Sequence, residues 1–136
     1  MLEIRETTLA DLKNIQRLWA DGEVMRFVGF PEGLQESDED LRAWIEHLSA
    51  VRPRVNHWSV YEDGVYCGET KYSIDEQTRS ASLDVKLFAS ARGRGIATKA
   101  LALYRRLGFT QKEMPEHVIA QGEDPETNLY FELHRN

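Results

Sequence analysis

The chain has 136 residues, a formal net charge of −6 at pH 7 and a single cysteine, Cys67. This length predicts one domain, residues 1–136, with one core; a lone cysteine without an internal disulfide fits a cytoplasmic protein, and no apolar run approaches the roughly 20 residues of a membrane span. An acidic surface repels phosphate backbones, which argues against nucleic-acid binding, and it would attract a cationic amine.

The first third of the sequence predicts one strand and two helices. Residues 2–5 alternate apolar and charged side chains, as a half-buried strand does. The segment Thr8–Asp11 resembles a capping box, and apolar residues recur at helical spacing over 9–19. Ser37 and Asp40 predict the start of a second helix. Its expected apolar face consists of Leu41, Trp44, Ile45 and Leu48.

The middle of the chain predicts three antiparallel strands joined by turns. The first strand ends at residues 62–64, Glu-Asp-Gly, a sequence typical of a hairpin. The second covers 65–74, and the third, 80–87, alternates apolar with polar side chains. Residues 128–133 are expected to form a final strand. This order predicts an α+β (mixed α/β) fold in which helices flank a sheet.

A glycine-arginine loop, residues 92–97 with the sequence RGRGIA, follows the third meander strand and opens a helix. Glycines let the backbone approach a ligand closely, and a helix N-terminus presents unpaired N–H groups and partial positive charge. Together these features favour a phosphate or pyrophosphate; the alternative is a basic surface turn. A P-loop pattern is absent, and counting from Gly93 the sixth position is Thr98, so a dinucleotide fingerprint is absent too.

The loop resembles the signature of the GNAT superfamily of acyl-CoA-dependent N-acyltransferases. That signature, R/Q-x-x-G-x-G/A, opens a helix after an antiparallel meander, and Arg92-x-x-Gly95-x-Ala97 matches it. The upstream order of strand, two helices and meander matches the family over nearly the whole chain. The resemblance implies a central, mostly antiparallel sheet, acetyl-CoA as co-substrate, and a splayed strand over 83–88 that holds the pantetheine arm. The implied cofactor-binding residues are Val85, Leu87, Arg92, Gly93, Arg94, Gly95, Ile96 and Ala97.

A second family pattern places a tyrosine four residues before Gly-Phe, as Tyr104 stands here before Gly108. In the family this tyrosine often protonates the departing CoA thiolate. A phenol with a pKa near ~10 stays protonated at neutral pH and suits that task. The alternative is that Tyr104 packs at a helix end, with Gly108 as the glycine that ends the helix.

The spacing between loop and tyrosine departs from the family. A helix, a strand and the start of another helix are expected there, yet only Thr98–Leu103 intervene. We therefore expect a strand and helix segment of roughly thirty residues to be absent between Lys99 and Leu103. Residues 96–107 would form one helix that carries Tyr104 roughly 12 Å from the loop, which is the wrong place for the acid. Three explanations of this short spacing are open: a segment of the polypeptide is missing from this sequence, the protein is a shortened form, or the family assignment is wrong. We favour the first.

Direct transfer needs a group that takes the proton of the attacking amine. Glu69 on the second meander strand and Asp84 on the third are the candidates, and His57 is a weaker one. Each has the alternative of a solvated strand residue, and Asp84 could simply pair with Lys86. No metal-ligand cluster is visible in the sequence. Residues 116–127 could form an acidic lid or a plain solvated loop.

These features predict an enzyme that transfers acetyl from acetyl-CoA to a primary amine of a small molecule or a peptide N-terminus. Transfer would be direct, in a ternary complex, with Tyr104, Asp84 and Glu69 as catalytic residues. A homodimer is compatible with the sequence. The alternatives are a non-catalytic acyl-CoA-binding module, a shortened inactive relative, and an interaction protein whose basic loop is a contact patch.

Overall fold

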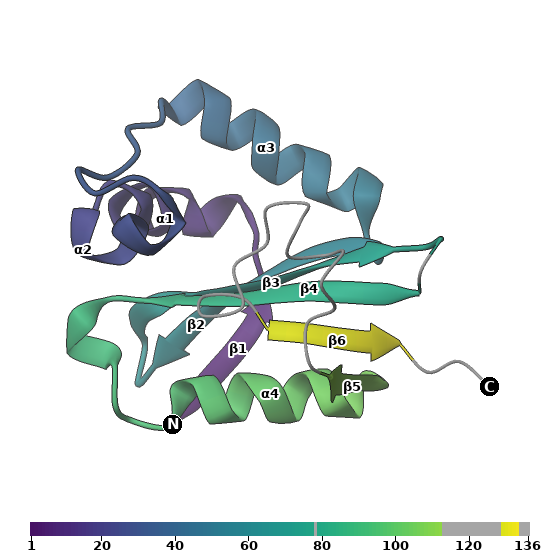
Figure 1. Cartoon of the computed structure of the whole chain (residues 1–136). Coiled ribbons are helices and arrows are strands. Elements are labelled where there is room, and N and C mark those ends of the chain that lie inside the picture. The colour runs from purple at the N-terminus through teal and green to yellow at the C-terminus, as the bar shows by residue number, and fades with distance from the viewer. Residues whose placement is uncertain (78, 113–128, 134–136) are drawn as a thin grey trace.

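A computed structural model of the chain describes residues 1–77, 79–112 and 129–133. The described residues form a 6-stranded sheet with the order β1-β2-β3-β4-β6-β5, in which every neighbouring pair is antiparallel (Figure 1). The strands are β1 (Leu2–Glu6), β2 (Val55–Glu62), β3 (Val65–Asp75), β4 (Ser80–Leu87), β5 (Phe109–Lys112) and β6 (Leu129–Leu133). The helices are α1 (Leu12–Trp19), α2 (Gly22–Met25), α3 (Asp38–Val51) and α4 (Ile96–Arg106), with short 3-10 turns at Leu9–Asp11, Arg26–Val28 and Ala89–Ala91. The predicted α+β fold is confirmed.

The predicted helix starts are also confirmed. Thr8 and Asp11 form a reciprocal capping box, and the Ser37 hydroxyl accepts the backbone N–H of Asp40 at 3.1 Å. These caps satisfy N–H groups that have no partner within the helix. They therefore set where the helices over the sheet begin.

Helices cover both faces of the sheet (Figure 1). On one face, α1, α2 and α3 close over a core whose buried members are Leu12, Ile15, Leu18, Val24, Met25, Leu41, Ile45, Tyr61 and Tyr66. On the other face, α4 closes over a mostly aromatic core of Trp58, Tyr72, Ala81, Leu83, Tyr104 and Phe109. The sheet thus separates two apolar layers, and any polar group on its strands belongs to one layer or the other.

A β-bulge interrupts the pairing of β2 with β3. Val60 pairs with Gly68 and Tyr61 with Tyr66, which leaves Cys67 as an extra residue on β3. A Cβ at Gly68 would lie 2.0 Å from the carbonyl oxygen of Lys86, so only glycine fits this close approach. The bulge aims Tyr66 at the α1–α3 layer and the buried Cys67 at the α4 layer.

The outer edge of β4 is paired along half of its length. β6 pairs with Ser80–Leu83, and among the described strands none pairs with this edge over Asp84–Leu87. This unpaired section, called the free edge below, overlaps the strand segment 83–88 that was expected to splay. It ends at the glycine-arginine loop.

Helix α4 is continuous through residues 99–103, as the spacing predicted. The prediction that a family strand and helix segment is absent there stays a prediction, as does a single domain over 1–136. The acidic segment 116–127 lies outside the described residues. Among the residues described, no helix is long and apolar enough to cross a membrane.

Candidate active site

The glycine-arginine loop ends at a helix N-terminus whose capping residue supplies no side chain. Gly95 is the N-cap of α4 with a φ of 77°, and Gly93 has the same φ. No heavy atom of the described residues lies within 4 Å of the place where a Cβ would stand at either glycine. A ligand can therefore approach the loop backbone closely at both glycines, beside a helix N-terminus of the kind that binds anions.

Arginines from two distant segments meet beside this loop. The Arg92 guanidinium donates to the Glu23 carbonyl at 3.3 Å and lies 5.5 Å from the ring centroid of Phe27. Arg26 lies over the same ring at 4.8 Å. Arg94 pairs with Glu62 at 2.8 Å, and this hydrogen bond raises the Arg94 pKa. The loop thus has a cationic border, to which Arg26 adds a charge that the sequence analysis did not anticipate.

Six polar side chains from β2, β3 and β4 lie together on the α1–α3 face of the sheet. The strand register aligns them in two rows. The rows are His57, Lys71 and Asp84, and Ser59, Glu69 and Lys86. We call this set the polar cluster. It brings together Glu69, Asp84 and His57, the three predicted candidates for the proton acceptor.

Within the polar cluster, His57 and Glu69 form a buried pair. Both side chains are 1% exposed, and His57 Nε2 contacts Glu69 Oε2. Trp19 Nε1 donates to Glu69 Oε1 at 2.5 Å, and the Trp44 ring packs edge-on against His57 with 4.9 Å between centroids. Burial lowers the pKa of His57, and nearby Glu69 opposes that shift only in part. The imidazole is therefore neutral at pH 7.

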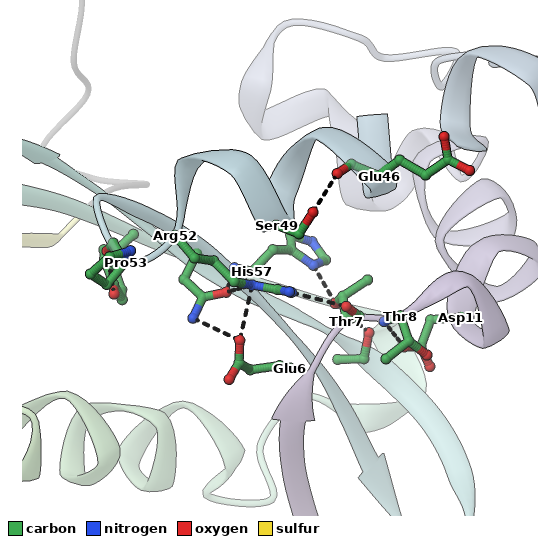
Figure 2. Close-up of polar contacts among 12 residues, drawn as sticks. Glu6, Thr7, Thr8, Asp11, Glu46, Ser49, Arg52, Pro53 and His57 are labelled. Carbon is green, nitrogen blue, oxygen red and sulfur yellow. Dashed lines mark hydrogen bonds and ion pairs between the residues drawn. The ribbon is translucent and has the colours of Figure 1, made fainter. Parts of the chain in front are cut away.

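The other imidazole nitrogen of His57 is engaged by the end of β1. Thr7 Oγ1 lies 2.6 Å from His57 Nδ1 and 2.8 Å from Ser59 Oγ. Figure 2 shows Thr7 joined by dashed lines to both His57 and Arg52. Arg52 donates to the Thr7 carbonyl at 2.9 Å and pairs with Glu6 at 2.9 Å. These two contacts of Arg52 fix the end of β1, and with it the position of Thr7.

Within the polar cluster, Asp84 lies at the start of the free edge of β4. Its Oδ2 pairs with Lys86 Nζ at 2.9 Å. Burial lowers the Lys86 pKa, but the negative charges of Asp84 and Glu69 raise it by more, so the net shift is upward. The Oδ1 atom of Asp84 is buried and has no hydrogen-bond partner among the described residues. A buried polar atom without a partner is rare in folded proteins and indicates a place for a ligand's donor group.

Tyr104 lies on the opposite face of the sheet, and its side chain is 1% exposed. Thr70 Oγ1 donates to the Asp84 carbonyl at 2.8 Å and lies 2.7 Å from the Tyr104 hydroxyl, so the phenol donates to the threonine. Burial raises the Tyr104 pKa, which keeps the phenol protonated. Through Thr70, the Tyr104 hydroxyl is therefore linked to the backbone of Asp84, where the free edge begins.

The fold places Tyr104 where its spacing from the loop did not indicate. From Ile96 to Tyr104 the helix rises about 12 Å. From Leu87 back to Asp84 the strand covers about 10 Å. Helix α4 runs back along β4 (Figure 1). The Tyr104 hydroxyl is therefore far from the loop but near the Asp84 end of the free edge. Whether Tyr104 acts as an acid stays a prediction.

The lowered His57 pKa carries an expectation for stability. As pH falls through about 6.5, the unfolded chain binds a proton at this histidine before the folded chain does, so the free energy of unfolding decreases. We expect urea unfolding between pH 8 and pH 5 to show this loss, and His57→Gln to flatten it. His47→Gln, at an exposed position on α3, serves as control. An equal slope in both variants would contradict the assignment.

Within the part of the chain that the structure describes, no group of three or more His, Cys, Asp or Glu side chains is placed to hold a metal ion.

The sequence matches a family model described as "Acetyltransferase (GNAT) domain" over residues 1–124. The chain belongs to this GNAT family. No curated protein matches the sequence. The GNAT fold is borne out by solved structures. An acetyltransferase from Salmonella typhimurium that modifies the N-terminal serine of ribosomal protein L7/L12 aligns with a TM-score of 0.64 and 15% identity, covering 98% of this chain and 95% of its own.

Two further GNAT-like structures match over much of their length. A spermidine N-acetyltransferase from Vibrio cholerae, in complex with CoA and spermine, aligns with a TM-score of 0.55 and 17% identity over 82% of each chain. An acetyltransferase from Thermus thermophilus aligns with a TM-score of 0.57 and 15% identity, covering 96% of this chain and 95% of its own. At these identities the likeness shows the GNAT fold alone.

Sequence reasoning missed several residues of the candidate site. Thr7, Trp19 and Thr70 each contact a predicted residue. Thr7 and Trp19 are each 50 residues from their partner, and Thr70 is 34 residues from Tyr104. No local pattern links positions so far apart. Strand alternation could have found Ser59, because it shares a face of β2 with His57.

Proposed function

We propose that this GNAT protein transfers an acetyl group from acetyl-CoA to a primary amine, directly and in a ternary complex. The observation that carries the proposal is the position of the free edge of β4, Asp84–Leu87. The glycine-arginine loop lies at one end of this edge. Asp84 at the other end has a carboxylate on one face of the sheet and a hydrogen-bond link to the Tyr104 hydroxyl on the other. A donor and an acceptor substrate could therefore meet at Asp84 from different sides.

The loop and the free edge together suit an elongated donor substrate with a phosphorylated end. Backbone N–H groups over 93–97 would bind the pyrophosphate beside the Arg92 side chain, with Gly93 and Gly95 giving close access to the backbone. The backbone of Val85 and Leu87 would hold the pantetheine arm as an added strand. A backbone N–H in this section would also stabilise the oxyanion of the tetrahedral intermediate.

The polar cluster suits the acceptor amine. As the N–C bond forms and the C–S bond breaks, the amine loses one proton and the CoA sulfur gains one, so the transfer is balanced. Asp84 and Glu69 are the proposed proton acceptors, and Tyr104 is the proposed donor to the thiolate. Lys86 and Lys71 both pair with Asp84, so the cluster can bind an amine without a large excess of negative charge.

The solved relatives support an amine acceptor but leave its size open. One relative modifies the N-terminal serine of a ribosomal protein, and another is a spermidine N-acetyltransferase. We therefore propose a small-molecule amine or a peptide N-terminus, acting in the cytoplasm. Nucleic acid and membranes are not among the proposed partners, and a homodimer remains a prediction.

The test is release of free CoA thiol when the purified chain receives acetyl-CoA with a panel of amines. The panel contains spermidine, a simple alkylamine and short peptides with a free N-terminus. We expect thiol release that depends on one class of amine, an acetylated acceptor by mass, and intersecting double-reciprocal plots. Binding of acetyl-CoA without thiol release would favour a non-catalytic module. Absence of CoA binding would favour an interaction protein.

A further inference from the structure

Three arginines near the glycine-arginine loop lie over aromatic rings. Arg26 and Arg92 share the ring of Phe27, at 4.8 Å and 5.5 Å from its centroid. Arg17, on α1, lies 5.3 Å from the ring centroid of Phe88, the residue that follows β4. In the described parts of the chain, no carboxylate forms an ion pair with any of the three. All three arginines are exposed, so their charges are open to a ligand.

Contact with a ring leaves the hydrogen-bonding capacity of an arginine largely unused. A guanidinium has five N–H donors, and an aromatic ring attracts the cation through its π face without accepting a strong hydrogen bond. A carboxylate, by contrast, would take up two of these donors and cancel the charge. In a chain with a net charge of −6, guanidinium groups that are held on rings and not neutralised indicate a site for an anion.

The proposed donor substrate carries an anion that suits this position. In acetyl-CoA the pyrophosphate joins the pantetheine arm to a ribose, and the ribose bears a further phosphate. The arm would run from the loop along the free edge toward Asp84, so the ribose leaves the pyrophosphate on the other side. From the loop, Arg92 reaches α2, where it donates to the Glu23 carbonyl at 3.3 Å (Figure 1). Arg26 shares a ring with Arg92, and so lies next to the pyrophosphate site.

We propose that Arg26 binds the ribose phosphate of acetyl-CoA, and that Phe27 positions it beside Arg92. The inference rests on the proposed function. A terminal phosphate carries close to two negative charges and three acceptor oxygens, which the planar donor set of an arginine matches. This site would let the protein distinguish CoA from a donor that has the same arm and pyrophosphate but lacks the ribose phosphate.

The turn that carries these two side chains is anchored to the helix layer. It spans Arg26–Val28 directly after α2, whose Val24 and Met25 are buried in the α1–α3 core. The N–H of Phe30 donates to the Met25 carbonyl at 3.0 Å and closes the segment on itself. Because the backbone is already held in place, only the side chains have to be ordered when the phosphate binds, which lowers the entropic cost of binding.

The test compares CoA with dephospho-CoA, which lacks only the ribose phosphate, by calorimetric titration. We expect the wild type to bind CoA about ten-fold more tightly, as one charge-assisted hydrogen bond at an exposed site would give. In Arg26→Gln the two affinities should become nearly equal through a loss for CoA alone, because the loop and Arg92 remain. Added salt should reduce the preference of the wild type, since the charges are exposed to solvent.

Arg17→Gln is the matched control, because Arg17 is also an exposed arginine over a ring on this face of the sheet. We expect this variant to keep the ten-fold preference for CoA. Two further variants test the ring. Phe27→Leu should lower the preference by a few-fold, because the leucine cannot hold the guanidinium, and Phe27→Tyr should retain it. Binding of dephospho-CoA by each variant shows that its loop is intact.

The outcomes distinguish the two proposals. If the wild type binds neither CoA nor dephospho-CoA, the proposed function is wrong. If the wild type binds both equally, or if Arg26→Gln keeps its preference for CoA, the ribose-phosphate site is overturned and the acetyltransferase proposal stands. An equal loss of preference in Arg17→Gln would overturn it as well, because the effect would then belong to the overall charge. Loss of both ligands in Arg26→Gln would show that Arg26 serves the loop and not the ribose phosphate.

Discussion

Replacing Gly95 by glutamate is expected to remove acetyl-CoA binding, with a loss on the order of 100-fold or more in affinity. Gly95 has a φ of 77°, a conformation that costs a residue with a side chain roughly 1–2 kcal/mol. The added carboxylate would stand at the start of α4, where the pyrophosphate is proposed to bind. Titration of CoA by calorimetry measures the loss directly.

Gly64→Glu is the control for both strain and charge. Gly64 lies in the turn between β2 and β3, has a φ of 80°, and like Gly95 has no heavy atom within 4 Å of its would-be Cβ. We expect this variant to bind CoA as the wild type does, with a similar fall in melting temperature. If Gly95→Glu keeps its CoA affinity, the loop is a basic surface turn, and the third alternative, an interaction protein, gains support.

Replacing Tyr104 by phenylalanine is expected to lower kcat by about 10²–10⁴-fold with little change in KM for acetyl-CoA. The ring keeps its place among Trp58, Tyr72 and Phe109, while the only proton donor of the side chain is lost. We expect kcat to fall because the Tyr104 hydroxyl lies at the end of the free edge where the thioester sulfur is proposed to lie. Steady-state kinetics of thiol release measures both constants.

Tyr72→Phe is the matched control for this prediction. Tyr72 belongs to the same aromatic cluster, and its hydroxyl donates to the Pro53 carbonyl at 2.6 Å. Each variant loses one hydrogen bond of a partly or fully buried phenol, at a cost of about 1 kcal/mol in stability. Equal and small effects on kcat in the two variants would mean that Tyr104 serves the core only and that another group, or water, protonates the thiolate.

Helices and strands were predictable because their signals lie within a few residues. The capping pair at Thr8 and Asp11 and the alternation along 80–87 are local patterns, and both are confirmed. The same alternation placed Asp84 opposite in phase to Leu83. The family signature at Arg92–Ala97 is also local, which is why the GNAT family could be identified from the sequence.

The contacts that build the candidate site were not predictable in the same way. The bulge at Cys67 depends on how β3 meets both neighbours, since Gly68 must fit against the Lys86 carbonyl. The proximity of Tyr104 to Asp84 depends on α4 returning along β4. Spacing alone suggested the opposite, because distance along a helix says nothing about what runs beside it.

The sequence by itself determined most of the secondary structure, though not α2 or β5, together with the GNAT family and the residue types from which a site could be made. The tertiary structure decided which of them meet. Strand register aligned Glu69 with Ser59 and Lys86, and the end of β1 brought the Thr7 hydroxyl to His57. The physical reason is that periodicity and capping act over one or two turns of chain, whereas a buried polar group takes its partner from whichever strand or helix the folded sheet lays against it.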